Sequence, residues 1–189
     1  MTYQQHRDSF YPESPENSVK ERIRRECEAE IRELRRTTKL ATQELPIEQQ
    51  KEAFKHALTN NVVVSVEATT GAGKSLDLGV WTVEHLGGKQ ARIAMTQPRR
   101  DAAEGVALAT AARHHLSFGN DVCFSTSEFH GNTDTTKLQI QTTGILVNRF
   151  RQDPLLHYYD AVIVDEAHER DLHIDFTLGL LKRANRLRA

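Results

Sequence analysis

The sequence predicts an α/β fold, a three-layer sandwich with a mostly parallel sheet, preceded by a charged N-terminal helix. Short apolar runs rich in β-branched residues alternate with helical stretches from Pro46 onward, as in strand–helix–strand units with helices on both faces of a sheet. Before that point the chain is dense in charge and has a helical apolar period. The length of 189 residues suits one domain of about 150 residues plus an extension.

Residues 1–44 are predicted to be a charged helical extension, and residues 45–189 the domain. Ser14, Pro15 and Glu16 form a helix-start signal, with a capping Ser, a Pro at the first helical position and an acid in the first turn. A narrow apolar stripe on one face of this helix consists of Val19, Ile23, Cys27, Ile31 and Leu34. This stripe either leans on the domain that follows or binds a partner helix, as in a coiled coil.

The domain divides into strands that are each followed by a helix. Because ligands bind beyond the carboxyl ends of the strands in a parallel sheet, the loops after Val66, Thr96, Thr142 and Val164 are predicted to lie along one rim that carries the chemistry. The predicted strands are residues 62–66, 92–96, 138–142 and 159–164, and the predicted helices are residues 74–86, 102–112, 144–150 and 174–186.

The first of these loops has the pattern of a phosphate-binding loop. Residues 68–75 read Ala-Thr-Thr-Gly-Ala-Gly-Lys-Ser, with an Ala where the pattern has its first Gly. Gly71 and Gly73 let backbone N–H groups turn toward phosphate oxygens, and the following helix adds its positive N-terminal end. Lys74 suits the β- and γ-phosphates, and the Ser75 hydroxyl suits Mg²⁺. The predicted ATP-binding residues are Thr69, Thr70, Gly71, Ala72, Gly73, Lys74 and Ser75.

Two carboxylates, Asp165 and Glu166, end the last predicted strand. Adjacent residues of an extended strand point to opposite sides, so the two acids can serve two tasks. Asp165 is predicted to hold Mg²⁺ beside Ser75, and Glu166 to orient and deprotonate the attacking water. A polar turn at a strand end is the plain structural alternative, and the phosphate loop upstream makes it the weaker one.

Two histidines near this strand suggest zinc as another alternative. His168 and His173 flank Glu169 and Asp171, but their spacing of five residues differs from the spacing of four in His-Glu-x-x-His. No third ligand is evident in the sequence around them. The zinc interpretation is therefore the weaker one.

Composition limits the partners and the compartment. Lys and Arg number 25 against 26 Asp and Glu, so no global positive field indicates nucleic acid, and such binding must come from local groups. Two cysteines are too few for a disulfide framework and fit a reducing compartment. No apolar run approaches the roughly 20 residues of a membrane span. We expect an intracellular and cytoplasmic protein, with the nucleus as the alternative, and without a membrane partner.

Residues 165–175 closely resemble the DEAH-box RNA helicases, whose name is spelled by Asp165–His168. Residues 96–100 look like the family's motif Ia, and residues 142–146 are similar to its motif Ib. The resemblance runs from Leu45 through the last predicted helix and includes four motifs in the correct order. It implies a P-loop NTPase fold of the RecA-like type, with this chain as the first of two RecA-like domains of an ATP-driven RNA translocase.

The resemblance also implies roles for individual residues. Glu166 would be catalytic, Asp165 and Ser75 would hold the metal of ATP·Mg²⁺, and His168 would couple the nucleotide state to a second RecA-like domain, in cis or in trans. Contacts to the backbone of RNA, or of other single-stranded nucleic acid, would not read bases. The residues implied to make these contacts are Arg99, Thr142 and Gly144.

Some positions depart from the family pattern. Thr69 stands where many members have Glu, and Ala109 stands where the family has an Arg beside adenine. The printed sequence holds neither a Ser-Ala-Thr motif nor a second domain with arginine fingers, so we expect a half-site with little hydrolysis. Two other functions stay open: a small-molecule P-loop kinase, and a non-catalytic, nucleotide-dependent adaptor that acts through the N-terminal helix.

Overall fold

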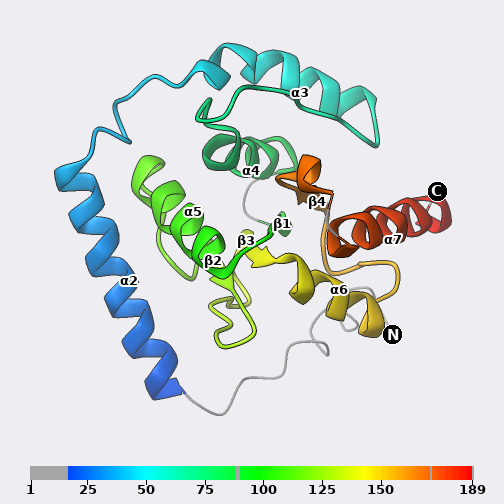
Figure 1. Cartoon of the computed structure of the whole chain (residues 1–189). Helices are drawn as coiled ribbons and strands as arrows, with labels where there is room; N and C mark the ends of the chain where they lie inside the picture. Colours follow the sequence, from blue (N-terminus) through cyan, green and yellow to red (C-terminus); the bar gives the residue numbers. More distant parts are fainter. Residues whose placement is uncertain (1–16, 88–89, 171, 189) are drawn as a thin grey trace.

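The computed structural model describes residues 17–87, 90–170 and 172–188 (Figure 1). Its four strands form one parallel sheet in the order β2-β3-β1-β4. Ile93 pairs with Leu138 on one side and with Ala161 on the other, so three strands are aligned at their amino ends. The strands are β1 (Ile93–Gln97), β2 (Val122–Ser125), β3 (Leu138–Thr142) and β4 (Ala161–Val164).

Helices cover both faces of this sheet, and the predicted α/β three-layer arrangement is confirmed (Figure 1). Side chains alternate across β1, so Ile93 and Met95 join a core with α4 and α5, whereas Ala94 joins a core with α6 and α7. The helices are α2 (Asn17–Thr37), η1 (Pro46–Gln50), α3 (Lys51–Asn60), α4 (Lys74–His85), α5 (Arg100–Arg113), α6 (Thr143–Gln152), η2 (Ala167–Glu169) and α7 (Leu172–Arg188).

The charged helix α2 packs its apolar stripe against the outer side of α5 (Figure 1). Cys27 and Ile31 are buried there, and the Arg35 guanidinium donates to the carbonyl oxygens of Ala111 and Leu116 at 2.9 and 3.1 Å. The stripe therefore leans on the domain, as the first of the two interpretations predicted. The predicted capping residues 14–16 lie outside the described residues.

A small third core joins η1 and α3 to α4, which carries the end of the phosphate loop. Ile47 and Trp81 are each 2% exposed, and Phe54 packs on Trp81 with ring centroids 6.1 Å apart. Lys51 and Lys55 hold the far end of α4 through Glu84. The helix α3 is absent from our sequence prediction, although this core gives it a reason to form.

The prediction of a strand at residues 62–66 is wrong. This segment forms no strand in the described structure, and Val62 and Val63 are 83% and 77% exposed. A β-branched run favours extended backbone, but a strand also needs a neighbour for its hydrogen bonds. Conversely, β2 is fully buried and was missed, because a run of only four residues carries too little periodic signal.

The other predicted elements agree with the structure to within two residues. The predicted strand 138–142 coincides with β3, and the predicted helix 74–86 begins at Lys74, as α4 does. The apolar β4 begins at Ala161 rather than at Tyr159, which is buried before the strand and donates its hydroxyl to Gln139 at 2.8 Å. Among the described residues, no helix is long and apolar enough to cross a membrane.

Candidate functional site

The phosphate-loop residues turn sharply into the first turn of α4. Gly71 and Gly73 have φ values of 78° and 98°, a region that glycine adopts without the steric cost of a side chain. Gly73 precedes α4 directly, and a Cβ atom added to it would lie 2.6 Å from Leu45 Cδ1. Gly71 has no such neighbour within 4 Å. The loop thus needs glycine at Gly73 for two reasons, backbone conformation and space.

Contacts from η1 and from the loop itself hold this turn. The amide of Ile47 donates to the carbonyl of Ala72 at 3.0 Å, and the amide of Ala72 donates to the carbonyl of Thr69 at 3.2 Å. The ammonium of Lys74 folds back over the loop and donates to the carbonyls of Ala68 and Thr69 at 2.5 and 3.2 Å. Lys74 therefore lies over the concave side of the loop, and it can exchange these acceptors for phosphate oxygens.

Asp165 lies beside the first turn of α4, at the carboxyl end of β4. Its Oδ2 accepts hydrogen bonds from the Ser75 hydroxyl at 2.5 Å and from the Gln97 side-chain amide at 2.6 Å. Its Oδ1 accepts from the amide of Glu166 at 2.9 Å, and the residue is only 9% exposed. The fold therefore brings the predicted metal pair, Ser75 and Asp165, into contact across 90 positions of the chain.

Gln97 is a member of this site that the sequence prediction missed. It is the last residue of β1 and is 3% exposed. Because Thr96 pairs with Val164 in the sheet, the residues that follow these two, Gln97 and Asp165, also lie side by side. That Gln97 and Asp165 are neighbours follows from the order of the strands in the sheet, and no motif spacing in the sequence indicates it.

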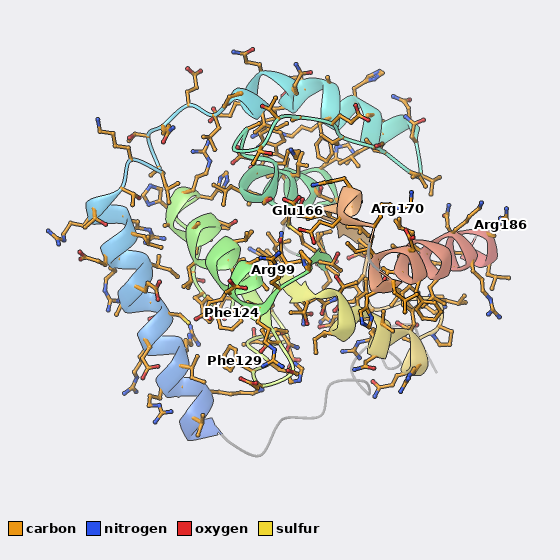
Figure 2. The ribbon with its side chains drawn as sticks, in the orientation of Figure 1. Arg99, Phe124, Phe129, Glu166, Arg170 and Arg186 are labelled. Carbon is orange, nitrogen blue, oxygen red and sulfur yellow. The ribbon has the colours of Figure 1, made fainter. Side chains whose placement is uncertain are left out.

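Glu166 begins a tight turn beyond β4 rather than continuing the strand. It has a φ of 52°, and Arg170, at the other end of η2, has a φ of 51°. Because β4 ends at Val164, strand alternation does not apply to Asp165 and Glu166, which corrects the basis of our prediction. The left-handed conformation costs a non-glycine residue about 1–2 kcal/mol, and strained residues of this kind often occur at functional sites. Figure 2 shows Glu166 and Arg170 on the connection between β4 and α7.

His168 and Glu166 are close enough for an ion pair when the histidine is protonated. The distance from His168 Nδ1 to Glu166 Oε2 is 3.4 Å, and the His168 side chain is 79% exposed. No group of three or more His, Cys, Asp or Glu side chains in the described part of the chain is placed to hold a metal ion. The residues around His168 and His173 that the structure describes thus form no such zinc cluster.

The three predicted RNA-contact residues lie at the starts of two helices on the same rim. Arg99 is the exposed residue that precedes α5 (Figure 2). Thr142 precedes α6, and Gly144 lies in the first turn of that helix. Gln97 pairs with Thr142 in the sheet, so the ends of β1 and β3 are neighbours. A Cβ atom added to Gly144 would have no heavy atom within 4 Å, so the backbone there is open to approach.

Comparison with known proteins identifies the family. A model of the DEAD/DEAH box helicase family matches residues 47–188. The chain is 38% identical over 144 residues to the ATP-dependent RNA helicase HrpA of Borreliella burgdorferi, covering 76% of this chain and 18% of that protein. It is 39% identical over 138 residues to HrpA of Escherichia coli, covering 73% of this chain and 11% of that protein.

A solved structure gives the same result for the fold. The crystal structure of the Escherichia coli DEAH/RHA helicase HrpB matches with a TM-score of 0.70 and 32% identity, covering 76% of this chain and 18% of that one. The chain thus spans between 11% and 18% of the length of these three relatives. The fold is RecA-like, as the resemblance implied. Because the family model matches residues 47–188, the chain belongs to the DEAD/DEAH box helicase family.

Proposed function

We propose that residues 45–189 act as the first RecA-like domain of a DEAH-type ATP-dependent RNA helicase. In this proposal the domain binds ATP with Mg²⁺ at the loop of residues 69–75 and the RNA backbone at the neighbouring rim. Residues 1–44 form the extension that includes α2. The contact between the Ser75 hydroxyl and Asp165, at 2.5 Å, carries the proposal, because it joins the phosphate loop to the acidic strand end.

The phosphates of ATP fit the concave side of the loop. Loop amides and the N-terminal end of α4 supply partial positive charge there, and Lys74 adds a full one. Lys74 already reaches back to the carbonyls of Ala68 and Thr69, and on ATP binding its ammonium group would exchange these acceptors for phosphate oxygens. Thr69 and Thr70, the first two of the predicted ATP-binding residues, are exposed.

The Ser75 and Asp165 side chains fit Mg²⁺ by their chemistry. A hydroxyl and a carboxylate are hard oxygen ligands, and protein Mg²⁺ sites usually provide one or two such groups and leave the remaining positions to phosphate oxygens and water. Bound there, the ion would neutralise charge that develops on the phosphates. Gln97 keeps the Asp165 carboxylate turned toward Ser75 by donating to the same oxygen.

Glu166 is the residue that we propose acts on the attacking water. It follows Asp165 directly at the start of the turn beyond β4, and its side chain is 37% exposed. A carboxylate within hydrogen-bond reach of a water can orient it and accept its proton. His168, 3.4 Å from Glu166, is the residue through which a second RecA-like domain would sense this site.

In this proposal, RNA contacts at the rim involve the backbone of the RNA strand. Arg99 supplies a charged donor, Thr142 a hydroxyl, and Gly144 an open backbone at the start of α6. Such contacts fix the register of a strand without reading its bases. This explains how a chain with a net charge of −1 can bind a polyanion, since a few local donors suffice.

The decisive experiment compares the 189-residue chain with Lys74→Ala and Glu166→Gln. ATP binding and RNA-stimulated ATP turnover are measured for all three proteins. Lys74→Ala is expected to lose binding, whereas Glu166→Gln is expected to bind ATP and not turn it over. We expect slow turnover even in the unchanged chain, because an arginine finger from a second domain contributes about 10³–10⁵ to the rate of phosphoryl transfer. Equal turnover in all three proteins would contradict the proposal.

A further inference from the structure

A buried arginine behind the phosphate loop connects three parts of the chain. Arg113 is the last residue of α5, and its side chain is only 7% exposed. Its guanidinium group contacts Asp77 of α4, Glu48 of η1, and the segment of residues 38–45, which joins α2 to η1. A charge is retained at a buried position only when it is well paired, so the partners of Arg113 define its role.

The first partner belongs to the helix that begins with Lys74. Arg113 Nε donates to Asp77 Oδ1 at 2.7 Å, and Nη2 lies 3.4 Å from Asp77 Oδ2. His114 Nε2 lies 2.8 Å from the same Oδ1. The amide of Asp77 donates to the carbonyl of Gly73 at 3.1 Å, so this carboxylate lies in the first turn of α4. Arg113 therefore holds the helical end of the phosphate loop.

The second partner reaches the loop from its other side. Arg113 Nη2 donates to Glu48 Oε1, and that oxygen also accepts the amide of Leu45 at 2.9 Å. The Leu45 side chain lies against Gly73, and the backbone amide of Ile47 donates to the carbonyl of Ala72. Through Glu48, Arg113 thus supports the segment that makes both of these contacts with the loop.

The third set of partners lies in the segment of residues 38–45. Arg113 Nη1 donates to the carbonyl oxygens of Leu40 and Gln43 at 2.6 and 2.9 Å. With Asp77 and Glu48, these acceptors use all five N–H donors that a guanidinium group has. A lysine has three donors and no planar fork, so it cannot satisfy the same set.

We propose that Arg113 is a positioning residue for the phosphate loop, and that it makes ATP binding at the loop depend on the conformation of residues 38–45. This inference rests on the proposed function, because the consequence for affinity requires that the loop binds ATP. Asp77 and Glu48 transmit the effect, since one is on the helix after the loop and the other holds the residues that contact Ala72 and Gly73. Coupling of this kind is reciprocal, so ATP must in turn stabilise residues 38–45.

The test uses Arg113→Lys and Arg113→Met in the full chain, with Glu48→Gln as a milder variant on the half-exposed side of the network. Phe150→Leu is the matched control, because it removes buried volume on the opposite face of the sheet, in the core of α6 and α7. Two quantities are measured below the unfolding temperature of every variant. One is ATP affinity, and the other is amide hydrogen exchange of residues 69–76 without nucleotide and of residues 38–45 with and without ATP.

We expect ATP affinity to fall about 10-fold in Arg113→Lys, by analogy with the removal of groups that orient the ligands of a metal site, and to be unchanged in Phe150→Leu. Exchange at residues 69–76 is expected to be faster in both Arg113 variants even without ATP. In the unchanged chain, ATP is expected to slow exchange at residues 38–45, and Arg113→Lys is expected to abolish this slowing. Glu48→Gln is expected to show a smaller change in the same direction.

Failure of this inference differs from failure of the proposed function. If the unchanged chain does not bind ATP, the proposed function fails, while loop exchange without ATP still tests whether Arg113 positions the loop. If ATP binds, but loop exchange and affinity in Arg113→Lys equal those of Phe150→Leu, Arg113 has only a structural role and the inference is overturned. ATP binding without any change of exchange at residues 38–45 would overturn the coupling.

Discussion

The side-chain amide of Gln97 donates to Asp165 Oδ2 at 2.6 Å, from the end of one strand to the end of its neighbour. The same carboxylate oxygen accepts the Ser75 hydroxyl. Gln97 therefore sets the direction in which the predicted metal ligand points. This relationship gives the first of four predictions.

Gln97→Leu is expected to raise the Mg²⁺ concentration that ATP binding requires. Without the amide, the Asp165 carboxylate loses one of the three hydrogen bonds that orient it, and groups that orient a metal ligand typically contribute about 10- to 100-fold to metal affinity. We expect the Mg²⁺ concentration for half-maximal ATP binding to rise, as titration calorimetry can measure. Gln139→Leu is the control, because it removes a buried glutamine of β3 that bonds to Ser125 instead. An equal rise in both variants would contradict the prediction.

Gly73→Ala is expected to destabilise the chain and to remove ATP binding. A left-handed conformation costs a residue with a side chain about 1–2 kcal/mol, and here the new Cβ would also lie 2.6 Å from Leu45 Cδ1. Gly105→Ala is the contrasting variant, since Gly105 lies inside α5 with no heavy atom within 4 Å of the added Cβ. There we expect a stability gain of about 0.5–1 kcal/mol, because alanine favours a helix. Urea unfolding measures the stability of both variants, and a Gly73→Ala variant as stable as the unchanged chain would contradict the prediction.

Asp77→Asn is expected to change how stability depends on pH. Burial alone would raise the pKa of Asp77, but hydrogen bonds from His114 and Arg113 lower it below its ordinary value of 3.8. A lowered pKa adds stability that is complete above the ordinary value and is lost as pH falls through the folded-state pKa. We expect the free energy of unfolding of the variant to be lower by about 3 kcal/mol at pH 7, since the substitution leaves a buried arginine partly unpaired. Below pH 4, we expect this free energy to fall less steeply with pH than in the unchanged chain.

Asp121→Asn is the control for this pH dependence. Asp121 pairs with Lys137 at 2.6 Å, and its pKa is also lowered, but its side chain is 27% exposed. Because solvent screens the pair, the loss of folding stability in Asp121→Asn at neutral pH is expected to be smaller than in Asp77→Asn, within about 1 kcal/mol. If Asp77→Asn and the unchanged chain lose stability in parallel as the pH is lowered, the assignment to Asp77 is wrong.

Arg99→Gln is expected to weaken RNA binding equally for all sequences. Removal of one phosphate contact should lower the slope of log affinity against log salt concentration by roughly one. Arg100→Gln is the matched control, because Arg100 is the next residue and forms an ion pair with Glu128. Fluorescence anisotropy with two unrelated single strands at several salt concentrations checks this. A loss that depends on the base sequence would show that Arg99 reads bases.

The motifs are the part of this protein that local sequence predicts well. The glycines of the phosphate loop, the start of α4 at Lys74 and the strand β3 appear as predicted, because each depends on the conformational preferences of neighbouring residues. The alternation of strands and helices was likewise sufficient for the parallel sheet with helices on both faces. Family membership of residues 47–188 agrees with these motifs.

Contacts between distant segments are the part that the motifs could not predict. Val62 and Val63 have the composition of a strand, yet no strand forms there in the described structure. Gln97 joins the site only because β1 lies beside β4, and Arg113 reaches the phosphate loop only because α5, η1 and α4 meet. Local preferences act within a few residues of the chain, whereas pairing of strands and burial of a charge depend on which segments pack together. For that reason the sequence alone predicted the fold class and the family of this protein, whereas the packing of its described segments determined which side chains lie beside the predicted site residues.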